Sequence, residues 1–142
     1  MIDLTTPLGV QVARRLEKET LVWLITVRAD GTPLPSLVWF LWDGTTLLIY
    51  SRPDKPKLLN IASQPHVALN FNSNQTGGAV TVFLGTAAID TAAPPSNLNE
   101  AYQAKYSLEI AQIGETPESF AAAYSVPLRV TPTRFWGWGL DE

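Results

Sequence analysis

Residues 49–61 read IYSRPDKPKLLNI, and this stretch decides the fold because an apolar strand ends in it and a helix begins. The strand is predicted over residues 46–50, and it ends in a hydroxyl side chain. Pro56 suits the first turn of a helix, where a missing backbone N–H costs nothing. At helical spacing Leu58, Ile61 and Ala62 form the face that is expected to pack on the core.

The polar residues of the same stretch form a candidate anion site. Lys57 and Asn60 are three residues apart and therefore share one face of the predicted helix. Ser51, Arg52 and Lys55 converge with Lys57 at the helix N-terminus, where free N–H groups and the helix dipole favour an anion. We interpret this as a phosphate site. An ordinary polar turn with solvated lysines is the alternative that the local sequence leaves open.

Two Asp-Gly pairs before this stretch predict an antiparallel meander. Asp30-Gly31 and Asp43-Gly44 each stand between apolar runs, and this pair is a strong hairpin signal because tight turns need positive φ. The three strands of the meander are expected over residues 21–28, 34–42 and 47–50.

The rest of the chain predicts three more strands and three more helices. The helices are expected over residues 6–19, 96–111 and 116–124, and the strands over residues 66–72, 79–90 and 127–138. Gly85 inside the long strand indicates a bulge, which a sheet needs where it curls. The prediction is one α+β domain over residues 1–142, built on a small, six-stranded, mostly antiparallel β-barrel with peripheral helices.

Composition narrows the class of protein. The chain has 142 residues, 46% hydrophobic residues, no cysteine and a net charge of −3. The negative charge argues against a nucleic-acid partner, which requires a basic face. The apolar runs are too short to span a membrane, and the N-terminus does not resemble a signal peptide. We therefore expect a cytoplasmic protein with no nucleic-acid or membrane partner. No spacing of histidine and carboxylates resembles a metal site.

Ordered motifs resemble the flavin-binding split-barrel superfamily, which contains the pyridoxamine 5′-phosphate oxidases. The motifs are Asp30-Gly31-x-Pro33, Val38-Trp39-Phe40, Tyr50-Ser51, Lys57-x-x-Asn60, Pro65-His66-Val67 and Gly85-Thr86-Ala87. No single motif is specific, and the resemblance rests on their order and spacing. It implies a split β-barrel and a homodimer that holds a flavin in a groove between the subunits.

The resemblance also implies which residues hold the cofactor. The second strand would follow the flavin ring and ribityl chain, and Ser51 and Lys57 would hold the phosphate through charge-assisted hydrogen bonds. Asn60 would orient Lys57, and Trp136 would reach the ring from the partner chain. The full set of expected cofactor-binding residues is Leu37, Val38, Trp39, Tyr50, Ser51, Arg52, Lys55, Lys57, Asn60 and Trp136.

Departures from the oxidases proper change the expected reaction. The oxidases carry basic residues where this chain has Ser36, Leu41 and Pro56. After their C-terminal tryptophan segment they also carry an arginine- and histidine-containing phosphate motif, which this sequence lacks after Trp138. We therefore do not expect oxidation of pyridoxamine 5′-phosphate.

The spacing Ser-x₅-Lys-x-x-Asn and the Val-Trp-Phe strand are closer to the short deazaflavin-dependent (coenzyme F-420) reductases. We expect an oxidoreductase that uses FMN, with coenzyme F-420 as the alternative cofactor, and that reduces a small apolar substrate by hydride transfer. A non-catalytic flavin-binding or stress-response module with the same pocket is the alternative function. The catalytic residues stay unassigned, since the sequence gives no reason to choose a proton donor among Tyr50, Tyr102, Tyr106 and Tyr124.

Overall fold

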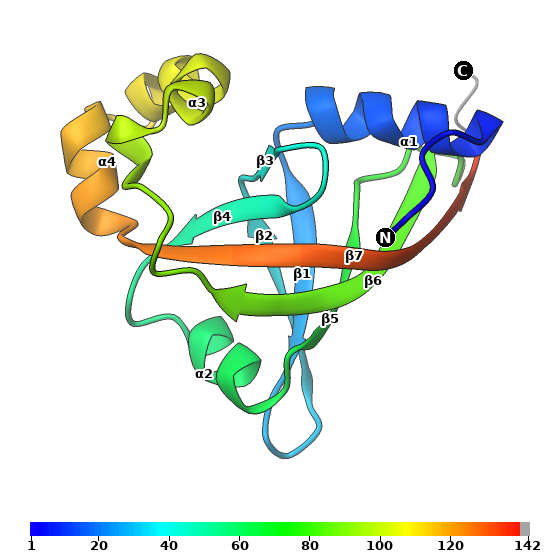
Figure 1. The fold of residues 1–142 in the computed structure, drawn as a ribbon, viewed down its shortest axis with the longest axis horizontal. Coiled ribbons are helices and arrows are strands. Elements are labelled where there is room, and N and C mark those ends of the chain that lie inside the picture. The colour runs from blue at the N-terminus through cyan, green and yellow to red at the C-terminus, as the bar shows by residue number, and fades with distance from the viewer. Residues whose placement is uncertain (140–142) are drawn as a thin grey trace.

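The computed structural model describes residues 1–139 and has one curled sheet with helices around it (Figure 1). The strands are β1 (Val22–Val27), β2 (Pro33–Val38), β3 (Leu41–Trp42), β4 (Leu47–Ser51), β5 (His66–Asn70), β6 (Val80–Ile89) and β7 (Val126–Trp138). The helices are α1 (Pro7–Lys18), α2 (Pro56–Ser63), α3 (Glu100–Gln112) and α4 (Pro117–Ala123), with a 3₁₀ turn at Ser96–Leu98. The predicted α+β class is confirmed, but the sheet has seven strands where six were expected.

The order of strands leaves the barrel open on one side. The sheet runs β2-β1-β5-β6-β7-β4-β3, and all neighbouring strands are antiparallel. β2 and β3 follow each other along the chain, yet they form the two opposite edges of the sheet. The curled sheet therefore closes through two residues of chain and not through a strand pair. We call the opening between the β2 edge and the β4–β3 edge the split.

The extra strand arises because the predicted strand over residues 34–42 is broken at Trp39 and Phe40. The Phe40 N–H donates to the Tyr106 hydroxyl over 2.9 Å, and the Phe40 carbonyl accepts from Lys105 Nζ over 2.9 Å. Side chains of α3 thus satisfy the backbone polar groups that a neighbouring strand would otherwise pair. The prediction of one continuous strand was wrong because these partners are 65 and 66 residues away in the sequence.

Most other elements form where the sequence predicts them. Thr6 caps α1 by accepting from the Gly9 N–H over 2.9 Å, and Thr116 caps α4. The helix expected from residue 96 is wrong in its first turn, because Asn99 begins α3 only after the 3₁₀ turn by accepting from the Tyr102 N–H. A helix must restart where a side chain caps its free N–H groups.

Glycines shape the turns and the bend of the sheet. Both Asp-Gly turns are present, and positive φ occurs at Gly31 (88°) and Gly44 (97°). The predicted bulge is confirmed, because the β6–β7 register shifts at Gly85. A Cβ at Gly85 would lie 2.4 Å from the Thr131 carbonyl oxygen, so only glycine allows the two strands to approach this closely.

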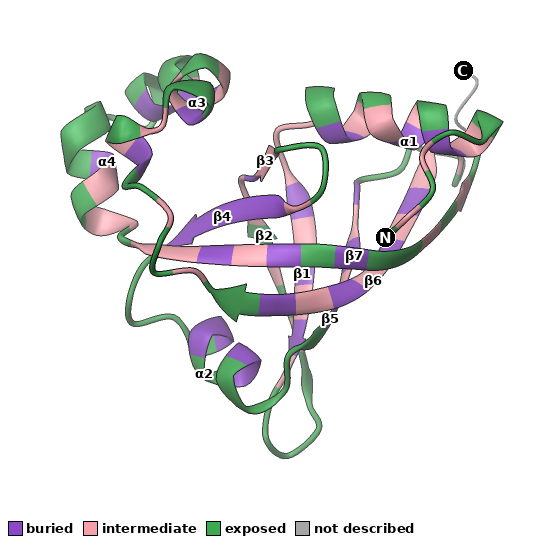
Figure 2. Ribbon diagram, in the orientation of Figure 1, coloured by how far each residue is buried: buried purple, intermediate pink, exposed green. Residues whose placement is uncertain are grey.

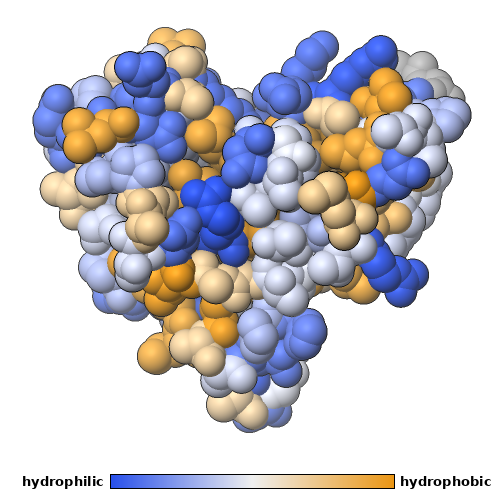
Figure 3. Space-filling model, in the orientation of Figure 1, coloured by the Kyte–Doolittle hydropathy of each residue, from blue (hydrophilic) through white to orange (hydrophobic). Residues whose placement is uncertain are grey.

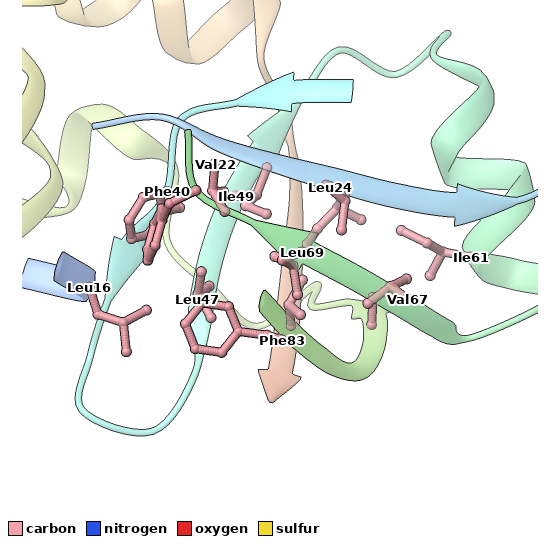
Figure 4. Packing of buried hydrophobic residues seen from close by; sticks show 14 of the residues in the cluster. Leu16, Val22, Leu24, Phe40, Leu47, Ile49, Ile61, Val67, Leu69 and Phe83 are labelled. Carbon is pink, nitrogen blue, oxygen red and sulfur yellow. The ribbon is translucent and has the colours of Figure 1, made fainter. Parts of the chain in front are cut away.

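The core fills the inside of the curl, where side chains of β1, β4, β5 and β6 meet those of α1 and α2 (Figure 4). A second buried cluster lies between β4 and the α3–α4 pair and is rich in aromatic residues. β4 is buried along its whole length because it separates these two clusters (Figure 2). The face shown in Figure 3 is a mixture of polar and apolar residues. β4 therefore ends, at Ser51, between two packed layers.

Candidate functional site

A cavity of about 370 Å³ opens at the split, where the ends of β2 and β4 meet α2, α3 and α4. It is lined by Leu37, Val38, Trp39, Tyr50, Ser51, Arg52, Lys55, Lys57, Tyr102, Ile113, Phe120 and Tyr124. Eight of the ten expected cofactor-binding residues are in this set. The structure therefore gathers nearly all of the predicted site into one pocket.

One end of the pocket is cationic and has no matching acidic group. The Lys57 side chain is only 8% exposed, and no carboxylate among residues 1–139 lies within 4.0 Å of its ammonium. Burial, and then repulsion from Lys55, lower the pKa of Lys57. Arg52 and Lys55 also form no ion pair in this part of the chain. A buried cation without a partner is costly unless a ligand supplies the missing negative charge.

The local backbone explains why these residues converge. Ser51 is the last residue of β4, where its hydroxyl donates to the Arg52 carbonyl over 2.9 Å. Pro56 occupies the first turn of α2, and the N-cap residue Lys55 makes no capping side-chain bond. The N-terminus of α2 thus lies between Lys55 and Lys57, both of which line the pocket. A helix N-terminus favours an anion.

The other wall is aromatic, and sequence reasoning expected Trp39 there but missed Phe120. Trp39 stacks on Tyr106 (centroids 4.9 Å apart) and on Phe120 (5.4 Å), and Phe120 stacks on Tyr124 (4.4 Å). The Arg52 guanidinium lies 4.8 Å from the Tyr124 ring, which links this column to the cationic end. Phe120 comes from α4, and Tyr124 directly follows this helix, which the local motifs do not connect to the site. The only sequence signal was the high aromatic content of residues 102–124.

Two of the expected residues lie outside the pocket. Asn60 was expected to orient Lys57, but its Nδ2 donates to Thr26 Oγ1 over 3.0 Å in a buried bond between α2 and β1. Asn60 therefore positions the helix and not the ammonium. Trp136 lies on β7, 40% exposed, and its expected contribution from a partner chain stays a prediction. Ala62, expected on the buried face of α2, is exposed, because Asn60 occupies that face.

A second, shallow groove lies on the outer face of the sheet, over β1, β5, β6 and β7. It contains His66, the only histidine of the chain, and Arg134. No cluster of three or more histidine and carboxylate side chains within residues 1–139 is arranged to hold a metal ion. In the same part of the chain, no helix has the length and apolar character needed to cross a bilayer.

A curled sheet with a cationic, half-enclosed pocket at its split defines a flavin-binding split-barrel protein. The chain belongs to the family described as pyridoxamine 5′-phosphate oxidase, whose model matches residues 9–139. The sequence matches no curated protein to which it was compared.

Solved structures with the same fold have varied names. An F-420 reductase is 25% identical, with 87% of this chain and 94% of that chain covered and a TM-score of 0.61. General Stress Protein 26 from Bacillus anthracis is 18% identical (92% and 93% covered, TM-score 0.70). HutZ, the heme storage protein from Vibrio cholerae, is 16% identical (96% and 100% covered, TM-score 0.66). The last two show the fold alone.

Proposed function

We propose that the protein binds a phosphorylated flavin, FMN, in the pocket at the split and acts as an oxidoreductase. The observation that carries this proposal is the largely buried Lys57, whose ammonium has no acidic partner in residues 1–139 and which lines the same pocket as Ser51. A phosphate would supply the missing charge and replace the hydration that burial removes. Family membership supports a flavin as the molecule that carries this phosphate.

The remaining pocket residues fit such a molecule. β2 is an edge strand, so backbone groups of its non-proline residues on the open side are free to contact the polar edge of a ring. Leu37, Val38 and Trp39 supply the apolar slot beside that edge. The bound flavin would supply hydride transfer. The protein would position the reactants and exclude water with the Trp39–Phe120 wall.

Coenzyme F-420 is the alternative cofactor. It also carries a phosphate and a similar ring, and the F-420 reductase that resembles this chain supports it. The same Lys57 and Ser51 would hold its phosphate. The distinction therefore has to come from binding measurements with both molecules.

For the reaction, we propose reduction of a small, unphosphorylated, apolar substrate. Leu41 takes the place of a cation in the oxidases and packs in the aromatic cluster beside Tyr50. Arg129 is not free to bind a second phosphate, because it forms ion pairs with Asp43 (3.1 Å) and Asp90 (2.8 Å). A phosphorylated pyridine would therefore lack the paired donors that a second phosphate needs.

A non-catalytic flavin-binding or stress-response module is the second candidate, supported by the fold shared with General Stress Protein 26. Heme storage, the role printed for HutZ, would commonly use a histidine ligand. The single histidine, His66, lies in the outer groove and not in the pocket.

We further propose a homodimer whose pocket uses both chains. Large apolar side chains remain exposed near the pocket and on β7, namely Leu37 (45%), Trp136 (40%) and Trp138 (56%). Exposed aromatic residues of this kind are enriched at protein interfaces. In this arrangement Trp136 of one subunit would cover the flavin bound by the other.

The visible spectrum of the freshly purified protein tests the central proposal. A flavin absorbs in the visible range, and mass spectrometry of the molecule released by denaturation would separate FMN from coenzyme F-420. Titration of apo-protein with FMN, riboflavin and coenzyme F-420 should then show tighter binding of the phosphorylated molecules. Colourless protein that binds none of them would refute the proposal.

Two activity assays separate the candidate functions. Turnover with a nicotinamide or with reduced coenzyme F-420 supports the reductase, whereas flavin binding without turnover of either supports the non-catalytic module. Incubation of FMN-loaded protein with pyridoxamine 5′-phosphate and oxygen should yield no pyridoxal 5′-phosphate at an enzymatic rate. Its formation would restore the oxidase assignment.

A further inference from the structure

Tyr102 lines the pocket with a hydroxyl that has no hydrogen-bond partner in residues 1–139 and that is not among the fully buried polar atoms. The residue as a whole is only 1% exposed. By contrast, the Tyr50 hydroxyl donates to the Pro94 carbonyl over 2.7 Å. The Tyr106 hydroxyl accepts from the Phe40 N–H and donates to the Phe40 carbonyl over 2.8 Å.

Packing against neighbouring rings holds the Tyr102 side chain in one position. Its ring meets the Tyr50 ring edge to face (4.8 Å between centroids), and it also packs against Tyr106 (4.9 Å) and Phe120 (6.1 Å). Its hydroxyl, which is not among the fully buried polar atoms, therefore reaches water only through the pocket. A molecule that fills the pocket displaces this water, and the hydroxyl then needs a new hydrogen-bond partner.

We propose that the Tyr102 hydroxyl donates a hydrogen bond to an oxygen of the molecule that occupies the pocket. This makes α3 a part of the binding site, although none of the sequence motifs includes this helix. The inference rests on the proposed function, because it takes the flavin as the occupant. The acceptor is an oxygen of the phosphate or an oxygen of the ribityl chain or ring.

The protonation state of Tyr102 suits this role. Burial raises the pKa of its hydroxyl, and the neighbouring Tyr106, Tyr50 and Tyr124 raise it further. The hydroxyl therefore remains a neutral donor at neutral and mildly alkaline pH. It would hold the ligand in place by donating a hydrogen bond, without taking part in proton transfer.

The test compares Tyr102→Phe with Tyr106→Phe, since each substitution removes one hydroxyl and keeps the ring. Tyr102→Phe should weaken FMN binding about threefold to tenfold, as expected for loss of one hydrogen bond. The melting temperature of its apo form should be unchanged, because the hydroxyl makes no hydrogen bond within residues 1–139. Tyr106→Phe should instead lower the apo melting temperature, because it breaks bonds within the protein.

Riboflavin, which lacks the phosphate of FMN, shows whether the acceptor is a phosphate oxygen or an oxygen of the ribityl chain or ring. Weaker binding of FMN alone places Tyr102 at the phosphate, and equal weakening of FMN and riboflavin places it at the ribityl chain or ring. Both results support the proposal. Unchanged affinity for both ligands, or an apo melting temperature that falls as in Tyr106→Phe, would overturn it. A wild-type protein that binds no flavin would overturn the proposed function itself. Flavin binding by the wild type is therefore measured before any variant is tested.

Discussion

Lys57 is the residue whose chemistry most directly determines what the pocket can hold. Replacing it with methionine keeps the length of the side chain and removes the charge. Lys57→Met should weaken FMN binding roughly tenfold to a hundredfold, since a charge-assisted hydrogen bond contributes about 1.5–3 kcal/mol. Riboflavin, which has no phosphate, should bind both proteins equally. Isothermal titration calorimetry of the two apo-proteins with the two ligands measures the difference.

Lys18→Met is the matched control for this experiment, because Lys18 is an exposed lysine in the last turn of α1. It should leave both affinities unchanged. Equal FMN affinity of wild type and Lys57→Met would remove Lys57 from the site and favour a solvated basic turn.

Thr26 and Asn60 form a buried polar contact that holds α2 on the sheet. Thr26→Val has a similar shape but leaves the Asn60 amide without its acceptor. We expect the free energy of unfolding to fall by about 1–3 kcal/mol, the usual cost of a buried unsatisfied group. Thr26→Ser keeps the hydroxyl and should lose much less. Urea unfolding of the three proteins checks this, and equal losses for valine and serine would show that only the methyl packing matters.

At the residue scale, sequence reasoning found what is local and missed what is distant. The residues from Tyr50 to Lys57 lie in one strand–loop–helix unit, so their order along the chain already placed them together. Asn60 was assigned a wrong role because its direction depends on β1, and helical spacing says nothing about a partner such as Thr26. Phe120 was missed because α4 reaches the pocket only through tertiary packing.

Among the elements, α3 carries Lys105, which makes the free energy of unfolding depend on pH in the alkaline range. Burial, partly opposed by Glu17, Glu19 and Glu109, lowers the pKa of Lys105 to about 8. The unfolded value is about 10.4, so between these values the unfolded chain binds more protons than the folded one. The free energy of unfolding should therefore rise as pH increases from about 8 toward 10.

Above about pH 10 the slope should reverse. Burial raises the pKa of Tyr102 and Tyr106 in the folded state, so these side chains ionise first in the unfolded chain. Urea unfolding at several values between pH 7 and pH 11 measures both slopes. Lys57, whose pKa is also lowered, contributes to the same rise. Lys105→Met should therefore reduce the rise and keep the decline, and an unchanged rise in this variant would contradict the assignment.

The β6–β7 pair depends on a glycine at its bulge. A Cβ at residue 85 would meet the Thr131 carbonyl oxygen at 2.4 Å and the Pro132 Cα at 3.0 Å, both of which are backbone atoms. Gly85→Ala should therefore push the strands apart and lower the free energy of unfolding by about 1–3 kcal/mol. Thr86→Ala, the next residue of β6, serves as the control and should have a small effect. The denaturant midpoints of both variants measure the two effects. A Gly85→Ala midpoint equal to that of wild type would contradict the close approach of β6 and β7 at this residue.

The elements themselves were largely predictable, because each carries local signals. Thr6 and Thr116 mark helix starts, and Gly31 and Gly44 mark turns. The exceptions have tertiary causes. The break at Phe40 depends on two side chains of α3, so no pattern within residues 34–42 could reveal it.

For the whole molecule, the pocket of one chain is open, and we expect a second chain to complete it. Light scattering should give a mass about twice the 15.6 kDa of the chain. Trp136→Ala should weaken flavin binding, although Trp136 does not line the pocket of its own subunit. Trp138→Ala changes the other exposed tryptophan of β7 and shows whether the effect is specific to position 136.

A monomer that still binds FMN tightly would contradict the two-chain pocket.

The sequence predicted the α+β class and the curled sheet, since hairpin turns and a bulge prescribe them. It could not predict how the two sheet edges meet, because β2 and β3 are adjacent in sequence and far apart in strand order.

That covalent closure has a mechanical consequence. The edges of an ordinary open sheet drift apart as far as their packing allows, but here a short tether joins β2 to β3. Val38 and Leu41 are three residues apart, so their Cα atoms can never separate by more than about 11 Å. The tether therefore sets an upper limit on the aperture of the barrel, and inserting glycines between Trp39 and Phe40 would lengthen it one residue at a time.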